Sequence, residues 1–314
     1  MKIILDAMGG DNAPEAPVLG ALDAVKQYGA DIILVGRGEA ILEVLKKNGL
    51  ETLPKGIEIA HADDVVDMHD DPGTVLHKRK NSSMVIGLKM LADGKGDAFV
   101  SAGSTGALLT GATLLVKRVR GIRRASMAPA MPTKAGHKVI VCDCGANAEC
   151  TPEFLLQFGL VASAYSKYTL GVENPRGGLL NFTGNVEARD VPLGAVDVVV
   201  CDGFNGNILI KSIEGTAMFM GSMLKRMFKK NVGSKLGYLL CKSGVKDLMK
   251  LLDYREIGGT QFLGIKKPVI KAHGSSDALA FRNAVKQAMT AAEGNFTTQL
   301  EQTLAALKGS EADA

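Results

Sequence analysis

Asp97–Val116, with the sequence DAFVSAGSTGALLTGATLLV, decides the fold predicted for this chain. Asp97–Val100 is typical of a short buried strand, and Leu108–Val116 carries apolar residues at helical spacing. The small residues between them, Ser101–Ala107, predict a tight turn from strand to helix. Such a turn directs backbone N–H groups and the positive end of the helix dipole at one point, which favours an anion. An ordinary strand-to-helix turn explains the stretch as well.

The composition of the turn adds to the case for an anion site. Gly103 and Gly106 allow the backbone to approach a ligand closely, and Ser101, Ser104 and Thr105 offer hydroxyl donors. The order of residues differs from the P-loop, which ends in Gly-Lys-Ser/Thr, and from the G-x-G-x-x-G of dinucleotide-binding folds. The turn therefore predicts anion binding without predicting a nucleotide.

Strands and helices alternate along the whole chain. Further strands are predicted at Ile3–Leu5, Ile32–Val35, Ile57–Ala60, Val139–Cys142, Val196–Val200 and Val269–Lys271, with helices between them. This alternation predicts an α/β fold, a three-layer α/β/α sandwich with a mostly parallel sheet. Residues 1–314 are expected to form a single catalytic domain with two lobes around a cleft.

Five polar, glycine-bearing loops follow the carboxyl ends of predicted strands. They are Asp6–Asn12, Ser101–Gly106, Asp143–Asn147, Asp202–Asn207 and His273–Asp277. Each could be simple turn chemistry, but ligands of open parallel sheets bind at this end of the strands. Together the loops predict a polar cleft for an anion. Ser275 or Ser276 is predicted to be the N-cap of the helix that follows His273.

One part of the chain does not fit the alternation. A strand is predicted to end at Leu179–Asn181, and another to begin directly at Phe182. Parallel neighbours need a crossover of about a dozen residues or more, and none is present. Either the two segments form a hairpin, or a segment is missing between Asn181 and Phe182.

Composition excludes several function classes. Aromatic residues make up 5% of the chain and Trp is absent, which argues against a surface that stacks nucleic-acid bases. The five His residues share no metal-ligand spacing, so no metal site is predicted. No apolar run is long enough to span a bilayer, and the first residues lead directly into a strand. The cysteines form no C-x-x-C pair and are expected to be buried thiols in a reducing cytoplasm.

The basic charge is concentrated in one segment. Between Gly215 and Lys246 there are seven Lys or Arg residues and no Asp or Glu, whereas the whole chain has a formal charge of +4. Residues 216–254 carry apolar residues at helical spacing on both sides of Gly233 and Gly237. They predict a protruding helical hairpin whose turn region bears apolar and basic residues: Lys229, Lys230, Lys235, Leu236, Tyr238, Leu239 and Leu240. Such a tip suits an anionic membrane surface or an acidic protein, although solvated lysines beside a subunit contact would have the same pattern.

Several motifs, taken together, resemble one family. They are DAMGGDNAP at Asp6–Pro14, KNSSM at Lys80–Met84, SAGSTGA at Ser101–Ala107, ENPR at Glu173–Arg176, NVEARD at Asn185–Asp190, DGFNGN at Asp202–Asn207 and HGSSD at His273–Asp277. The chain is similar to the bacterial phosphate acyltransferases over residues 2–291. The resemblance implies a fold like that of phosphate acetyltransferase and isocitrate-type dehydrogenases. It also implies transfer of a long-chain acyl group from acyl carrier protein to inorganic phosphate for phospholipid synthesis.

The implied reaction assigns expected roles to the loop residues. Phosphate is itself the nucleophile, so the enzyme has to position it, stabilise an oxyanion and let a thiolate leave. His273 is the expected acid or oxyanion partner, and Asp202 and Asn207 are expected to orient phosphate or carbonyl. The expected substrate- and phosphate-binding residues are Asp6, Gly9, Asp11, Asn12, Ser101, Gly103, Ser104, Thr105, Gly106, Asp143, Asn147, Ser275 and Ser276.

The resemblance also implies partners and location. We expect a cytoplasmic homodimer, attached peripherally to the inner face of the membrane, which binds acyl carrier protein and phosphate and uses no cofactor. Two alternatives stay open. One is acetyl transfer from coenzyme A to phosphate on the same fold, and the other is a non-catalytic membrane scaffold for acyl carrier protein. A family segment of roughly 25 residues, expected where the crossover is missing, implies that this chain lacks a loop there.

Overall fold

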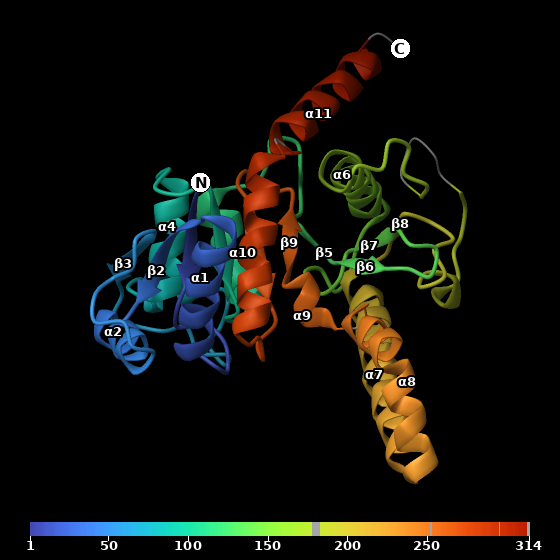
Figure 1. The fold of residues 1–314 in the computed structure, drawn as a ribbon. Coiled ribbons are helices and arrows are strands. Elements are labelled where there is room, and N and C mark those ends of the chain that lie inside the picture. The colour runs from blue at the N-terminus through green and yellow to red at the C-terminus, as the bar shows by residue number, and fades with distance from the viewer. Residues whose placement is uncertain (178–182, 252, 295, 313–314) are drawn as a thin grey trace.

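The computed structural model describes residues 1–177, 183–251, 253–294 and 296–312. The proposed gap between Asn181 and Phe182 lies outside them. The described residues form two sheets (Figure 1). The large sheet has the strand order β3-β2-β1-β4-β10-β9-β5, and the small sheet has the order β6-β7-β8.

The large sheet is mostly parallel, as the alternation predicts. β3, β2, β1, β4 and β10 run parallel to one another, whereas β9 is antiparallel to both β10 and β5. Its strands are β1 (Lys2–Asp6), β2 (Asp31–Gly36), β3 (Ile57–His61), β4 (Ala98–Ser101), β5 (Ser126–Ala128), β9 (Gly259–Leu263) and β10 (Val269–Ala272). Because β1, β4 and β10 are neighbours, the loops that leave them emerge side by side.

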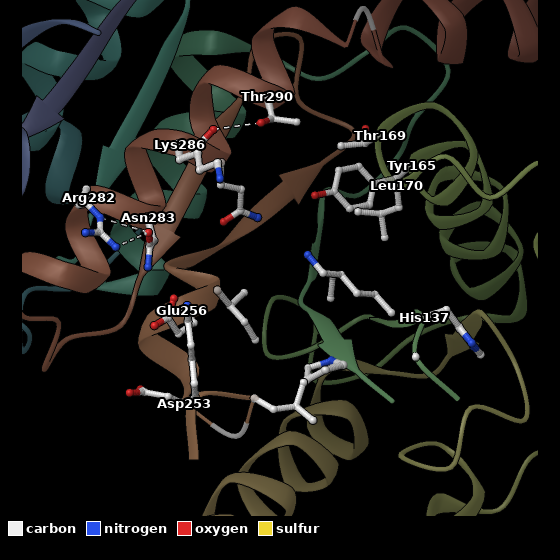
Figure 2. A pocket seen from close by; sticks show the side chains of 18 of the residues that line it. His137, Tyr165, Thr169, Leu170, Asp253, Glu256, Arg282, Asn283, Lys286 and Thr290 are labelled. Atoms are coloured by element: carbon white, nitrogen blue, oxygen red, sulfur yellow. Dashed lines mark hydrogen bonds between the residues drawn. The ribbon is translucent and has the colours of Figure 1, made fainter. Parts of the chain in front are cut away.

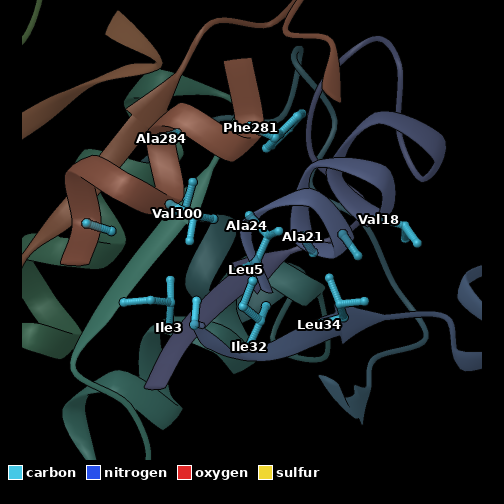
Figure 3. Close-up of a cluster of buried hydrophobic side chains, with 14 of the residues drawn as sticks. Ile3, Leu5, Val18, Ala21, Ala24, Ile32, Leu34, Val100, Phe281 and Ala284 are labelled. Carbon is cyan, nitrogen blue, oxygen red and sulfur yellow. The ribbon is translucent and has the colours of Figure 1, made fainter. Parts of the chain in front are cut away.

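Helices cover both faces of the large sheet. Ile3 and Leu5 of β1 pack with α1, α2 and α10, and Phe281 of α10 lies in the same cluster (Figure 3). Ile4 points to the opposite face and packs with α4, α5 and the π-helix η1. This alternation is the period-two pattern of a strand buried on both sides. The bounds are α1 (Glu15–Tyr28), α2 (Gly38–Lys47), α3 (Val75–Lys78), α4 (Ser83–Ala92), α5 (Thr105–Gly111), η1 (Ala112–Val116) and α10 (Ala278–Glu293).

The small sheet forms a second lobe with its own core. Its strands are β6 (Ala130–Pro132), β7 (Lys138–Cys142) and β8 (Val198–Val200), with β7 and β8 parallel. α6 (Pro152–Leu170) packs on this sheet, and α11 (Phe296–Ala312) packs on α6 through the Tyr165–Phe296 ring contact. A strand and its exit loop were predicted to begin at Phe182 and to end at Glu187. Residues 183–187 form no strand, and the short 3₁₀ turn η2 (Ala188–Asp190) follows.

A helical hairpin projects from the body, as predicted (Figure 1). It consists of α7 (Gly203–Lys229) and α8 (Val232–Leu251), after which α9 (Tyr254–Ile257) leads back to β9. The predicted turn was wrong, because the chain reverses at Lys230–Asn231 and Gly233 and Gly237 lie inside α8. Leu236, Tyr238, Leu239 and Leu240 are therefore helical residues of α8 near the tip rather than turn residues.

Candidate active site

Three of the five predicted loops meet at the carboxyl end of the large sheet. The backbone N–H of Asp11 donates to Gly274 O at 2.8 Å, and Asn12 Nδ2 donates to Ser275 O and Ser276 O at 3.2 Å. The loop after β1 is thereby tied to the loop after β10. Gly9 lies against the turn after β4, because a Cβ at this residue would be 2.8 Å from Gly103 N.

Asp6 and Ser101 form the buried base of this cluster. The side chain of Ser101 donates to Asp6 Oδ2 at 2.7 Å and accepts the N–H of Gly103 at 3.1 Å. Asp6 is 1% exposed and Ser101 is fully buried. Burial raises the pKa of Asp6, and the hydrogen bonds from Ser101, Ser83 and the backbone oppose that rise. Both side chains hold neighbouring loops together, and their polar atoms are already engaged.

The glycines of the predicted anion turn are needed for packing. A Cβ on Gly103 would lie 2.6 Å from Met84 Cε, and one on Gly106 would lie 2.8 Å from Pro72 Cγ. Their missing side chains leave room for these protein atoms, and their part in anion binding stays a prediction. Ser104 is buried and makes no capping hydrogen bond to α5, and Thr105 is half-buried at the first position of that helix.

The loops after β7 and β8 form a second cluster. Asp143 Oδ1 accepts the N–H groups of Met127 and Cys144, both at 2.7 Å, and Oδ2 accepts the N–H and side-chain amide of Asn147 at 2.6 and 2.9 Å. Burial raises the pKa of Asp143 against these stabilising bonds. These four hydrogen bonds engage both carboxylate oxygens of Asp143 and hold the turn after β7 in place. The backbone and side-chain nitrogens of Asn147 both donate to the same oxygen, Oδ2.

Asp202 begins the long helix that leaves the second cluster. Its carboxylate accepts the N–H of Asn205 at 2.8 Å and the amide of the same residue at 2.7 Å, so it is the N-cap of α7. The backbone bond from Asn205 lowers the pKa of Asp202. Asn207 is exposed and lies near Gly145 of the neighbouring loop, where its amide is accessible to a ligand.

His273 connects the two clusters. Its Nδ1 is 2.8 Å from Ser275 Oγ, and its Nε2 is 3.3 Å from Lys211 Nζ on α7. Burial and, next, the charge of Lys211 lower the pKa of His273, so its ring is neutral at pH 7. Lys211 is also paired with Glu214 at 2.7 Å. The sequence analysis did not single out Lys211, because it lies beyond the Asp202–Asn207 motif and only the fold brings it to His273.

Lys271 is a second cation that the sequence analysis missed. From β10 its Nζ donates to Ala102 O at 3.3 Å and to Ala272 O, so the side chain reaches the turn after β4. Burial and the charge of Lys211 lower the pKa of Lys271 to about 8. A lysine in an otherwise apolar strand, two residues before His273, was the signal that could have identified it.

Ser276 has an unsatisfied polar side chain at this site. It is 1% exposed, and its Oγ finds no hydrogen-bond partner among the described residues. It precedes α10, but the N-cap of that helix is Asp277, whose Oδ1 accepts the N–H of Ala280 at 3.0 Å. The predicted serine cap was therefore wrong, because the carboxylate takes the capping bond and leaves Ser276 without it. A buried hydroxyl without a hydrogen-bond partner carries a desolvation cost of about 1–3 kcal/mol.

No cluster of His, Cys, Asp or Glu suited to a metal ion occurs in the described part of the chain. Among the same residues, no helix has the length and apolar content needed to cross a bilayer.

A separate pocket of about 1060 Å³ lies between α6 and α10 (Figure 2). Tyr165 and Leu170 line it from the small lobe, and Arg282 and Lys286 line it from the large lobe. None of the residues predicted for the active site lines it. It is therefore distinct from the polar site around His273.

The sequence similarity of this chain to known proteins shows the family to which it belongs. The family described as "Fatty acid synthesis protein" matches residues 1–182 and 180–299. The phosphate acyltransferase of Alkaliphilus oremlandii is 42% identical over 336 aligned residues, covering 99% of each chain. That of Clostridioides difficile is 38% identical and covers 96% of each. The chain belongs to the phosphate acyltransferase family. It is a phosphate acyltransferase enzyme of fatty acid and phospholipid synthesis.

The same comparisons bear on the fold and on the predicted gap. A phosphotransacetylase from Streptococcus pyogenes superposes with a TM-score of 0.55 at 16% identity, covering 94% of both chains. A 4-hydroxythreonine-4-phosphate dehydrogenase from Klebsiella pneumoniae gives 0.50 at 13% identity, covering 93% of this phosphate acyltransferase and 99% of the dehydrogenase. These likenesses confirm the predicted fold. The family match divides at residues 180–182, which is where the crossover was judged to be missing.

Proposed function

We propose that this enzyme transfers a long-chain acyl group from acyl carrier protein to inorganic phosphate, in a cleft between its two lobes. The observation that carries the proposal is the site where Lys211 lies 3.3 Å from His273 and close enough to Lys271 for its charge to lower the pKa of that residue. Two lysines beside an imidazole suit a phosphate. Family membership supplies the reaction type.

The proposed reaction needs no covalent enzyme intermediate. A lone pair on an oxygen of hydrogen phosphate forms a bond to the thioester carbon, and the carbon–sulfur bond breaks with its electron pair going to sulfur. The thiolate takes up the proton that hydrogen phosphate loses, so the products are acyl phosphate and the free carrier thiol. Lys211 and Lys271 hold the phosphate charge. The neutral His273 ring donates an N–H bond to the developing oxyanion or to the leaving sulfur. Asn207, exposed at the start of α7, orients the thioester carbonyl.

The α7–α8 hairpin is proposed to make the homodimer contact and to attach the enzyme to the inner face of the membrane. Its helices expose large apolar side chains along their length, including Met218 and Phe219. Near the tip, Leu239 is 63% and Leu240 is 87% exposed, beside Lys229, Lys230 and Lys235. Apolar groups among cations suit an anionic surface, and the cations also suit an acidic acyl carrier protein.

The proposed function is tested by donor choice. Phosphate-dependent formation of acyl phosphate, trapped as the hydroxamate, is measured with hexadecanoyl-acyl carrier protein, with acetyl-coenzyme A and with no donor. Product from the carrier thioester supports the proposal. Product from acetyl-coenzyme A alone identifies a phosphate acetyltransferase, and no product from either donor leaves a scaffold role.

Replacement of His273 tests its proposed catalytic role. His273→Ala should lower turnover about 10²–10³-fold, the range for removal of one oxyanion donor. Ser275→Ala is the matched control, because it removes the hydroxyl that contacts Nδ1 but leaves the ring in place. Equal turnover in His273→Ala and the unmodified enzyme would show that the ring has no catalytic role.

A further inference from the structure

The pocket of about 1060 Å³ between α6 and α10 is separate from the proposed phosphate site, and the proposed reaction leaves it without a role. Arg282 and Lys286 of α10 line it from the large lobe, and Tyr165 and Leu170 of α6 line it from the small lobe (Figure 2). Sites for small molecules are clefts of about 300–1000 Å³ and often lie between domains. This pocket therefore has room for a ligand that contacts both lobes.

The α10 side of the pocket presents two cations. Arg282 and Lys286 are four residues apart and therefore lie on one side of the helix. The guanidinium of Arg282 donates to the neutral Asn283 Oδ1 at 3.3 and 3.4 Å, and Lys286 Nζ lies 5.5 Å from the centre of the Tyr28 ring. Within the described part of the chain, neither cation forms an ion pair with a carboxylate. Both can therefore bind an anion without losing a charged partner.

Cations also outnumber the remaining carboxylates around the whole pocket. Asp253 is already paired with Arg255 at 2.6 Å, and His137 contacts Asp197 at 3.1 Å. The other charged side chains of the lining are four cations and two carboxylates: Lys138, Lys250, Arg282, Lys286, Asp247 and Glu256. The pocket therefore favours a ligand with negative charge.

The α6 side of the pocket is apolar and carries one neutral donor. Leu170 and Val172 line the pocket there, and further apolar residues of the lining are Ala130, Pro132 and Ile257. Tyr165 is 2% exposed, and burial raises the pKa of its hydroxyl, which therefore stays protonated at pH 7. Figure 2 shows this hydroxyl directed from α6 toward α10. The pocket thus combines cations on one side with apolar side chains on the other, which suits an amphiphile.

We propose that this pocket binds a long-chain lipid anion, with a carboxylate or phosphate head and an apolar chain. The head pairs with Arg282 and Lys286, and the chain lies against the apolar side chains of α6. Such a ligand contacts both lobes, and the 3.3 Å contact between Lys211 of α7 and His273 also joins them. A lipid in the pocket therefore holds the lobes at the separation on which that contact depends.

Equilibrium dialysis with radiolabelled dodecyl phosphate and dodecanoate, both below their micelle-forming concentrations, tests the site. Lys286→Met removes the charge but keeps a long side chain, and it should weaken the binding of both ligands at least about 10-fold. Lys167→Met on α6 is the matched control, because Lys167 also lies over a tyrosine ring, 5.7 Å from the centre of Tyr168, but does not line the pocket. It should leave both affinities within about twofold. Tighter binding of dodecyl phosphate would assign a phosphate head, and tighter binding of dodecanoate would assign a carboxylate.

Butyl phosphate tests the apolar part of the pocket. Each buried methylene is worth roughly fourfold in binding. Butyl phosphate should therefore bind at least about 100-fold more weakly than dodecyl phosphate. Similar affinities for the two phosphates would show that the pocket binds the head alone, which contradicts a lipid site.

Three further outcomes would overturn the proposal. One is the absence of saturable binding of both long-chain ligands, and another is the same affinity in Lys286→Met as in the unmodified enzyme. The third is loss of binding in Lys211→Met, which would assign the ligand to the site around His273. These measurements require no turnover, so their failure is distinguishable from a failure of the proposed function.

Discussion

Replacement of Ser101 by Ala tests whether the base of the proposed cleft depends on its buried hydrogen bonds. Ser101 Oγ donates to Asp6 Oδ2 at 2.7 Å and accepts from Gly103 N at 3.1 Å, and all three residues are buried. Each polar group left unsatisfied in the interior costs about 1–3 kcal/mol. The substitution should therefore lower the free energy of unfolding by about 2–5 kcal/mol.

That energy converts to a measurable change in melting temperature. With an unfolding entropy of about 2.1 cal/mol/K per residue, the 314 residues give about 0.7 kcal/mol/K. The Tm of Ser101→Ala should thus fall by about 3–8 °C in differential scanning calorimetry. Ser104→Ala is the control, because Ser104 is buried in the same turn but makes no capping bond, and its Tm should stay within about 1 °C.

The loss of stability in Ser101→Ala should depend on pH, because Asp6 changes its protonation state. The pKa of Asp6 is raised in the folded protein, so the folded state binds its proton more tightly than the unfolded state does. The contribution of Asp6 to stability is then complete below its unfolded pKa and is lost as pH rises through the folded value. Removal of the Ser101 donor raises the Asp6 pKa further, and the loss should be larger at pH 7 than in acid. A Tm for Ser101→Ala within 1 °C of the unmodified protein at pH 7 would refute the reasoning.

Three further predictions concern the cation, the tip and the turn. Lys271 has a pKa of about 8, so kcat/KM for phosphate should fall as pH rises above about 8. This decrease should disappear in Lys271→Arg, because arginine stays protonated at that pH. If the decrease persists in Lys271→Arg, another group causes it. Leu239→Glu combined with Leu240→Glu should abolish salt-sensitive sedimentation with anionic liposomes and leave dimerisation and turnover intact; continued sedimentation would exclude the tip as the membrane contact. Gly106→Val should lower the free energy of unfolding by about 1–3 kcal/mol through its clash with Pro72, and an unchanged urea midpoint would contradict this contact.

The fold was predictable because its signals are local. Alternating apolar strands and periodic helices specify a parallel sheet covered on both faces, and β1, β4 and β10 lie within one or two residues of the predicted bounds. The sequence also predicted that the loops after these strands lie close together, because the carboxyl ends of parallel strands share one edge of the sheet.

Side-chain roles were less predictable, because they depend on contacts between distant segments. Asp6 and Asp143 have the residue types of ligand-binding groups, but burial and internal hydrogen bonds engage their oxygens. Lys211 and Lys271 appear isolated in the sequence and meet only when α7 lies beside the loop after β10. The turn of the hairpin was misplaced because helical neighbours overcome the cost of about 1 kcal/mol per interior glycine, as at Gly237.

A crystal structure of the enzyme soaked with phosphate tests the central claim most directly. We predict phosphate bound beside the adjacent amino group of Lys211 and ring of His273, and close to Lys271. Lys211→Met should abolish this density while the fold stays unchanged. Phosphate bound elsewhere, or the same density in Lys211→Met, would contradict the proposed site.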